Sequence, residues 1–418
     1  MNSTHPANLK RWWKPRYTVL FIMWLVYGCF YLTRLTLGPV IPLIMGDLNF
    51  SHAQVGLISS FFFAFYAFAQ LPAGYLSDIF SPQKIITFGG LTSALANYCF
   101  SAGPGLLYLI GFQSLNGIGQ GGGFGPIVKL LNNWFPKSER GLALGIHNTC
   151  VSIFTFLAYV LAGYLGKAFG WRTVFWFTPF TLLPVLVISW AIVDDYPANN
   201  IRSEVGYRPE ESSGKSSVHI NRLKTILSKK NMILACFGFF CLMYITYCNL
   251  VWLPAYLYES YGLSIIKAGF LAGIYPLVGL VARPLGGFLS DVPMHGKRKP
   301  LLLVGFSSIL LATLFLANTA RLEWAMVLIV IVGFFDQLIQ SLFFALELDI
   351  LPSELTGTGA GFLETGGHLG SMSAMFFTGL FVDFFGSYNA VFLSLSFLAA
   401  TGIVVAIFVR EDKLLSVE

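Results

Sequence analysis

Charged residues lie inside long apolar stretches of this chain, where charge is costly. Arg34, Asp336 and Glu364 each fall within such a stretch, and His368 lies one helical turn beyond Glu364. A charged side chain at the centre of a bilayer costs about 2.5–3.5 kcal/mol on insertion scales, so it normally faces water or a partner. Arginine keeps its charge and offers a planar fork that fits a carboxylate or a phosphate. Arg34 is therefore the first candidate for binding an anion.

Asp336, Glu364 and His368 are the candidates for proton coupling. A carboxylate removed from water can bind and release protons near neutral pH, and histidine titrates in that range. If Arg34 lies near Asp336, a substrate anion that competes for Arg34 would favour a proton on Asp336, which is a direct route to symport. Two alternatives stay open: a permanent Arg34–Asp336 ion pair that holds the protein together, and hydrogen bonding between helices for Glu364 and His368.

The elements that must position these residues are membrane-spanning helices. The chain is 56% hydrophobic and 11% charged, against about 25% charged for a soluble domain. A helix needs about 20 apolar residues to cross the hydrocarbon core. The sequence predicts an all-α membrane protein with twelve spans, near 17–44, 54–77, 83–102, 104–131, 142–166, 172–193, 232–257, 264–289, 299–318, 322–349, 357–383 and 387–409.

The distribution of basic residues predicts the topology. Placing both termini in the cytoplasm assigns 19 of the 26 Lys and Arg residues to cytoplasmic segments and 4 to outer loops, as the positive-inside rule requires. We therefore expect a multi-pass protein of the cytoplasmic (inner) membrane with both termini inside. Residues 1–193 and 232–418 are expected to form two six-helix bundles, joined by a cytoplasmic linker at 194–231.

The two halves repeat each other. The segment from Gly74 to Asp78 returns 213 residues later as Gly287 to Asp291, and further matches follow at shifts of 213 and 216. An internal repeat in a very apolar chain is typical of secondary transporters. We expect positions that agree between the halves to be scaffold and positions that differ in charge to carry function.

The chain resembles the major facilitator superfamily over its whole length. The Gly74–Asp78 segment with Lys84 matches part of the family's loop motif, although Ile79 and Ser81 replace a basic residue and a glycine. Other family-like motifs are Trp134-Phe135-Pro136, Glu139-Arg140-Gly141 and Gly170-Trp171-Arg172. The resemblance implies two pseudo-symmetric six-helix bundles, with spans one, four, seven and ten lining a central cavity.

Span one resembles the organic-anion branches of that superfamily, the organophosphate–phosphate antiporters and the anion–cation symporters. The similarity rests on Tyr31-Leu32-Thr33-Arg34, and on Tyr66, Gln70, Pro72 and Gly74 in span two. It implies that Arg34 binds the substrate anion. The phosphate antiporters carry a second arginine where this chain has Thr246 or Tyr247, a departure that favours a smaller or singly charged anion.

The repeat extends the candidate binding site. At the shift of 213 Arg34 corresponds to Tyr247, and at the shift of 216 Gln120 corresponds to Asp336 and Asn148 to Glu364. We predict that the substrate-binding residues are Arg34, Tyr31, Gln120, Tyr247 and Tyr66.

Four residues at the predicted cytoplasmic helix ends are candidates for gating. Aspartates near helix termini and arginines on adjacent helices suit a breakable network that would stabilise an outward-open state. The predicted network consists of Asp78, Arg140, Arg283 and Asp291.

These patterns predict a secondary transporter of a small organic anion, by proton symport or anion exchange. A proton-driven exporter of drugs or siderophore-like metabolites is an alternative, and so is a receptor that signals through its termini. We expect no enzyme, because no nucleophile–base constellation occurs. We also expect no cofactor, metal or nucleic-acid partner, and a monomer in the bilayer.

Overall fold

The computed structural model describes residues 15–136, 138–197, 225–352 and 355–409, and the ordered elements in these ranges are helices. The first half contains α1 (Pro15–Leu35), α2 (Leu37–Leu48), α3 (His52–Ile79), α4 (Pro82–Ser101), α5 (Leu106–Gly121), α6 (Phe124–Trp134), α7 (Arg140–Phe169) and α8 (Trp171–Ile192). The second half contains α11 (Lys230–Tyr261), α12 (Ile265–Ala272), α13 (Ile274–Leu277), α14 (Gly279–Asp291), α15 (Lys299–Leu316), α16 (Leu322–Ile350), α17 (Thr356–Phe385) and α18 (Asn389–Phe408). The central part of the predicted linker, residues 198–224, lies outside the described residues.

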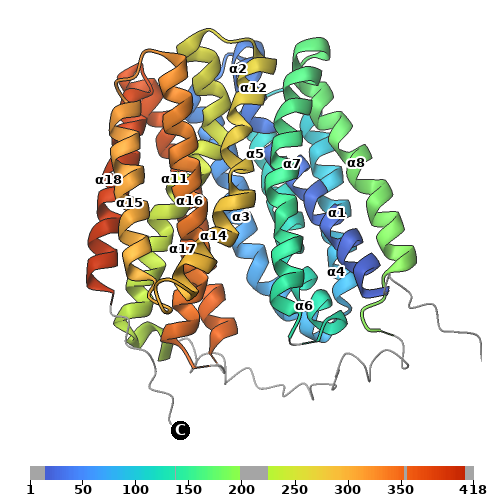
Figure 1. Ribbon diagram of the computed structural model, residues 1–418. Helices are drawn as coiled ribbons and strands as arrows, with labels where there is room; N and C mark the ends of the chain where they lie inside the picture. Colours follow the sequence, from blue (N-terminus) through green and yellow to red (C-terminus); the bar gives the residue numbers. More distant parts are fainter. Residues whose placement is uncertain (1–14, 137, 198–224, 353–354, 410–418) are drawn as a thin grey trace, which may run out of the picture.

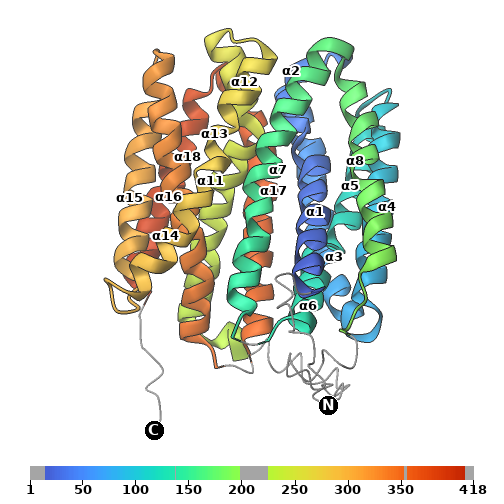
Figure 2. The same cartoon turned by 45° about the vertical axis from the view of Figure 1, so that its right-hand side comes forward.

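The helices form twelve crossing segments, as the sequence predicts. Ten segments in the described ranges are long and apolar enough to span a membrane. The remaining two are α4 and the α5–α6 segment, which run beside the others and are richer in glycine and polar residues. The fold is thus an all-α membrane fold of two six-helix bundles (Figures 1 and 2).

Several crossing segments are interrupted at glycines. Gly122 and Gly123 separate α5 from α6, and Gly273 separates α12 from α13. Glycine weakens a helix by about 0.5–1 kcal/mol relative to alanine, because it loses more conformational freedom on folding. These interruptions lie in segments that adjoin the centre of the molecule, where α5 ends just after Gln120.

The contacts between the two bundles include two seams that the repeat relates, beside a contact of α2 with α11. One seam joins α3 to α17 and the other joins α12 to α7. Gly56 on α3 and Gly269 on α12 are separated by 213 residues, and Gly163 on α7 and Gly379 on α17 by 216. Each bundle therefore supplies one glycine to each seam.

These glycines allow backbone to touch backbone. A Cβ atom on Gly379 would lie 2.2 Å from the carbonyl oxygen of His52, and one on Gly56 would lie 2.4 Å from that of Met375. In the second seam, a Cβ on Gly269 would lie 2.8 Å from the carbonyl oxygen of Tyr159. Small residues permit such close approach between helices in lipid.

The seams lie toward one end of the molecule. α1 begins and α18 ends at what we call the near end, which is lower in Figure 1, and the turn from α2 to α3 lies at the opposite, far end. The seam contacts use the first two turns of α3 and α12 and the last three turns of α7 and α17, which lie toward the far end. The described contacts thus pack the two bundles together at the far end.

Candidate substrate-binding site

Arg34 lies in the last turn of α1, just before the chain passes into α2. Its side chain is buried, with the residue 5% exposed. Nε donates a hydrogen bond to Oε1 of Gln120 at 2.8 Å, and Nη2 has no hydrogen-bond partner among the described residues. Because a guanidinium carries five N–H donors, Arg34 retains donors that can bind an anion.

Three aromatic rings surround the Arg34 guanidinium. Cζ lies 4.6 Å from the ring centre of Tyr31, 4.7 Å from that of Tyr66 and 5.7 Å from that of Phe62. A cation over an aromatic face is stabilised by about 0.5–2 kcal/mol. The rings thus offset part of the cost of burying the charge.

A polar network fixes the orientation of Gln120. Its Nε2 donates to Thr33 Oγ1 at 2.9 Å and to Asn116 Oδ1 at 3.2 Å, and Ser93 Oγ donates to the same Asn116 oxygen at 2.6 Å. With the amide nitrogen engaged in this way, the carbonyl oxygen of Gln120 must face Arg34. Gln120 therefore orients the Arg34 side chain, and its role in binding substrate stays a prediction.

The second bundle approaches Arg34 through Tyr66. The ring of Tyr66 lies 4.6 Å from the imidazole of His368, and Nε2 of His368 lies 3.4 Å from Oε2 of Glu364. Tyr66 thus contacts both Arg34 in the first bundle and His368 in the second. Tyr247 also belongs to this region, with its ring 4.6 Å from that of Phe63.

Asp336 lies in a separate cluster within the second bundle. Thr246 donates to Oδ1 at 2.7 Å, while Tyr275 and Gln337 donate to Oδ2 at 2.8 and 3.3 Å. The carboxyl group is fully buried. The alternative of an Arg34–Asp336 ion pair is not formed, since each residue has its partners in its own bundle.

The internal repeat explains the position of Asp336. Thr33 and Thr246 are separated by 213 residues, and Gln120 and Asp336 by 216. In one bundle Gln120 contacts Thr33, and in the other Asp336 contacts Thr246. The two contacts are equivalent, but the first bundle adds Arg34 where the second has Tyr247.

Among the described side chains, Arg140, Arg283 and Asp291 of the predicted gating network do not contact one another. Arg140 donates to the backbone carbonyls of Asn132 and Phe135 at 2.8 and 3.1 Å. Asp291 pairs with Arg298, which also contacts Asp349 at 3.1 Å. The Arg140 contacts lie within the first bundle, and the Asp291 contacts lie within the second.

Arg283 contacts Gln337 of α16, which is not one of the predicted gating residues. Its Nε donates to Oε1 of Gln337 at 2.8 Å, which connects it to the Asp336 cluster. The side chain of Asp78 lies outside the described residues. Arg140, Arg283 and Asp291 each contact groups of their own bundle in this conformation. A gating role for the four residues therefore stays a prediction, which concerns another conformation.

Comparison with known proteins identifies the family. Residues 23–373 and 294–417 match the family model of the Major Facilitator Superfamily. The chain belongs to this superfamily. The resemblance seen in the sequence is thereby confirmed, and this major facilitator protein is a membrane transporter and not an enzyme.

The similar proteins include carriers of organic acids. The chain is 28% identical to the probable galactarate/D-glucarate transporter GudP of Bacillus subtilis, covering 95% of this chain and 92% of that one. It is 27% identical to the probable sulfoacetate transporter SauU of Cupriavidus necator, covering 95% and 94%. A crystal structure of a bacterial homologue of the human lysosomal transporter Spinster superposes with a TM-score of 0.75 at 20% identity, over 94% of this chain and 95% of that one.

Proposed function

We propose that this major facilitator protein carries a small organic anion across the membrane by alternating access around Arg34. The observation that carries the proposal is the buried guanidinium, which is held by Gln120 through Nε and has no hydrogen-bond partner at Nη2. No carboxylate among the described residues forms an ion pair with it. Burying a charge in this way is costly, and a bound anion would offset part of that cost.

The proposed substrate is an organic acid, and Arg34 binds one of its acidic groups. Relatives are named as transporters of galactarate or D-glucarate, sulfoacetate and hexuronate. Hexuronate carries one acidic group, as the sequence favours, and the others carry two. The repeat partner of Arg34 is Tyr247, so the second bundle offers a phenol and not a second guanidinium. Tyrosine hydroxyls suit the polar remainder of such an acid.

We assign coupling to Glu364 and His368 in preference to Asp336. The Glu364–His368 pair contacts Tyr66, which also contacts Arg34, whereas Asp336 is saturated by donors of its own bundle. An anion bound to Arg34 would neutralise a positive charge that opposes protonation of Glu364. A proton on Glu364 would in turn remove a negative charge that repels the anion, so each favours binding of the other.

The proposed orientation places the near end in the cytoplasm. The topology expected from basic residues puts both termini inside, and α1 begins and α18 ends at the near end. The far-end seams then close the outer side. Residues 1–193 and 232–418 would rock as two bundles joined through 194–231.

The test is uptake by purified protein in proteoliposomes. We expect saturable uptake of D-glucarate, a hexuronate or sulfoacetate, and its loss in Arg34→Gln. Arg321→Gln is the matched control, because Arg321 is exposed and directly precedes α16. Uptake by Arg34→Gln with an unchanged KM would contradict the assignment. Transport of apolar cations in place of every acid would support the exporter instead.

A further inference from the structure

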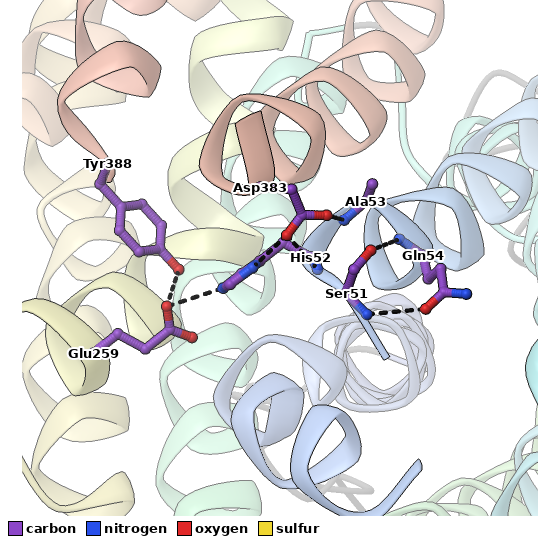
Figure 3. A network of polar contacts seen from close by, with 7 residues as sticks. All are labelled: Ser51, His52, Ala53, Gln54, Glu259, Asp383 and Tyr388. Atoms are coloured by element: carbon purple, nitrogen blue, oxygen red, sulfur yellow. Dashed lines mark hydrogen bonds and ion pairs between the residues drawn. The ribbon is translucent and has the colours of Figure 1, made fainter. Parts of the chain in front are cut away.

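His52 connects the two bundles at the far end through two carboxylates. Its Nδ1 lies 2.8 Å from Oδ1 of Asp383, and its Nε2 lies 3.0 Å from Oε2 of Glu259 (Figure 3). His52 is the first residue of α3, Asp383 lies in the last turn of α17, and Glu259 lies in the last turn of α11. We call His52, Asp383 and Glu259 the far-end clamp.

The geometry of the clamp requires a proton. A neutral imidazole has one N–H donor and one acceptor nitrogen, so it can donate to only one of two carboxylates. The other nitrogen would then place its lone pair against a carboxylate oxygen. Both contacts of His52 are satisfied only if the imidazole carries two protons or if one carboxylate is protonated. The closed clamp therefore holds one more proton than neutral histidine with two carboxylates.

The other groups that face the clamp do not replace this proton. From the segment that joins α17 to α18, Tyr388 donates to the same Glu259 oxygen at 3.0 Å, and burial raises the pKa of this phenol well above its usual range, so it stays a donor. From α11, the ring of Trp252 lies 6.1 Å from the imidazole. On the first bundle, Ser51 and Gln54 bond each other's backbone, and Asp47 of α2 is bound by Arg172.

The clamp is confined to one of the two seams. The repeat partner of His52 is Ile265, and that of Asp383 is Lys167. The α7–α12 seam therefore has the glycine packing without a titratable pair. An asymmetry in an otherwise repeated contact points to a role beyond scaffold.

We propose that the far-end clamp is a proton-binding site that takes its proton from the solution at the far end when the two bundles close there. Its side chains are partly accessible, with exposed fractions of 18% for His52, 26% for Glu259 and 27% for Asp383. Opening of the far end separates His52 from both carboxylates and returns the proton to the same solution. The clamp thus contributes nothing to net proton movement.

The consequence is regulation by pH on the far side. The closed state binds a proton that the open state releases, so acid favours closure and alkali favours opening. One proton changes the ratio of closed to open molecules by at most about tenfold per pH unit. The inference rests on the alternating-access part of the proposed function but not on the identity of its substrate.

The test measures the separation of the bundles at the far end without substrate. Spin labels are placed at Ala168→Cys, at the end of α7, and Ala320→Cys, before α16, which are both exposed. The half-buried Cys99 and Cys236 are changed to serine first. Between pH 8 and pH 5.5, electron–electron distance measurements on protein in nanodiscs should show a growing short-distance population.

The His52→Gln variant should lose this pH response while eluting as a folded protein, and Glu259→Gln should weaken it. The matched control is His295→Asn, an exposed histidine near the opposite end, where asparagine tolerates the positive φ of 52°. A pH response in His52→Gln equal to that of the native chain would overturn the proposal. A native population ratio that does not change with pH would overturn it as well. Neither result depends on which anion is carried.

Discussion

Gln120 accepts a hydrogen bond from Arg34 at 2.8 Å and thereby holds the guanidinium at the centre of the molecule. The amide does this without neutralising the charge, which a carboxylate in the same place would do. In the second bundle a carboxylate does occupy the equivalent position, as Asp336, but its neighbour is Tyr247 and not an arginine. The first bundle thus binds the cation of Arg34 with an amide, and the second bundle binds the acid of Asp336 with hydroxyl groups.

Replacement of Gln120 by glutamate should weaken substrate binding. The new carboxylate would form an ion pair with Arg34, and the substrate anion would have to displace it. Because hydrogen bonds to charged groups contribute about 1.5–3 kcal/mol, we expect KM to rise roughly tenfold to hundredfold, with a smaller effect on kcat. Gln120→Leu, which removes the hydrogen bond but adds no charge, is the comparison. An equal KM in the two variants would argue against competition.

The ring of Tyr66 should matter more than its hydroxyl. Tyr66→Phe keeps the aromatic face 4.7 Å from Arg34 Cζ, so its KM should stay within about threefold of native, whereas Tyr66→Leu removes a cation–π contact of about 0.5–2 kcal/mol. We expect the leucine variant to raise KM by about two- to thirtyfold. Uptake kinetics of both variants check this, and a larger effect in Tyr66→Phe would refute it.

Glu364 and Asp336 should differ in their effect on coupling. Glu364→Gln should remove the dependence of accumulation on a proton gradient while sparing exchange of labelled for unlabelled substrate. Asp336→Asn should keep both, because asparagine can contact Thr246 much as Gln120 contacts Thr33. Proton-driven accumulation in Glu364→Gln, with its loss in Asp336→Asn, would transfer the coupling role to Asp336.

Alanine at Gly379 of the α3–α17 seam should impair transport more than alanine at Gly163 of the α7–α12 seam. A Cβ on Gly379 would lie 2.2 Å from a backbone oxygen, compared with 3.2 Å for Gly163. We expect Gly379→Ala to lower the transport rate at least about tenfold and Gly163→Ala to have a smaller effect, since only the first contact requires the helices to move apart. Gly111→Ala, whose new Cβ would meet nothing within 4 Å, should behave as native.

The fold could be predicted almost entirely from the sequence. Runs of about 20 apolar residues are a strong signal, because a helix is a structure that satisfies its own backbone in lipid. The break between α5 and α6 at Gly122 and Gly123 was not predicted, since the same glycines also suit close packing of one continuous helix.

The candidate site could be predicted in part. The sequence indicated Arg34, and the repeat indicated Gln120, whereas the Arg34–Asp336 ion pair that the sequence left open is not formed among the described residues. Comparable depth in the membrane does not say in which direction two side chains point. The threonines could have been found, because Thr33 and Thr246 match at the same shift of 213 that relates the surrounding residues.

The far-end clamp could not be predicted. His52 is separated from Glu259 by 207 residues and from Asp383 by 331, and each of the three lies at a helix end where charged residues are common. The signals in the sequence were two differences between the halves, His52 against Ile265 and Asp383 against Lys167.

The carboxylate of Asp383 does more than contact the imidazole of His52. It accepts hydrogen bonds from the backbone N–H groups of His52 and Ala53 at 3.0 and 2.8 Å. The first two amides of α3 are therefore hydrogen-bonded to a residue of the opposite bundle. Amides that lose their partners exchange hydrogen with water much faster. Deuterium uptake at these two positions therefore reports whether the far end is closed, and it does so in the native chain without any label.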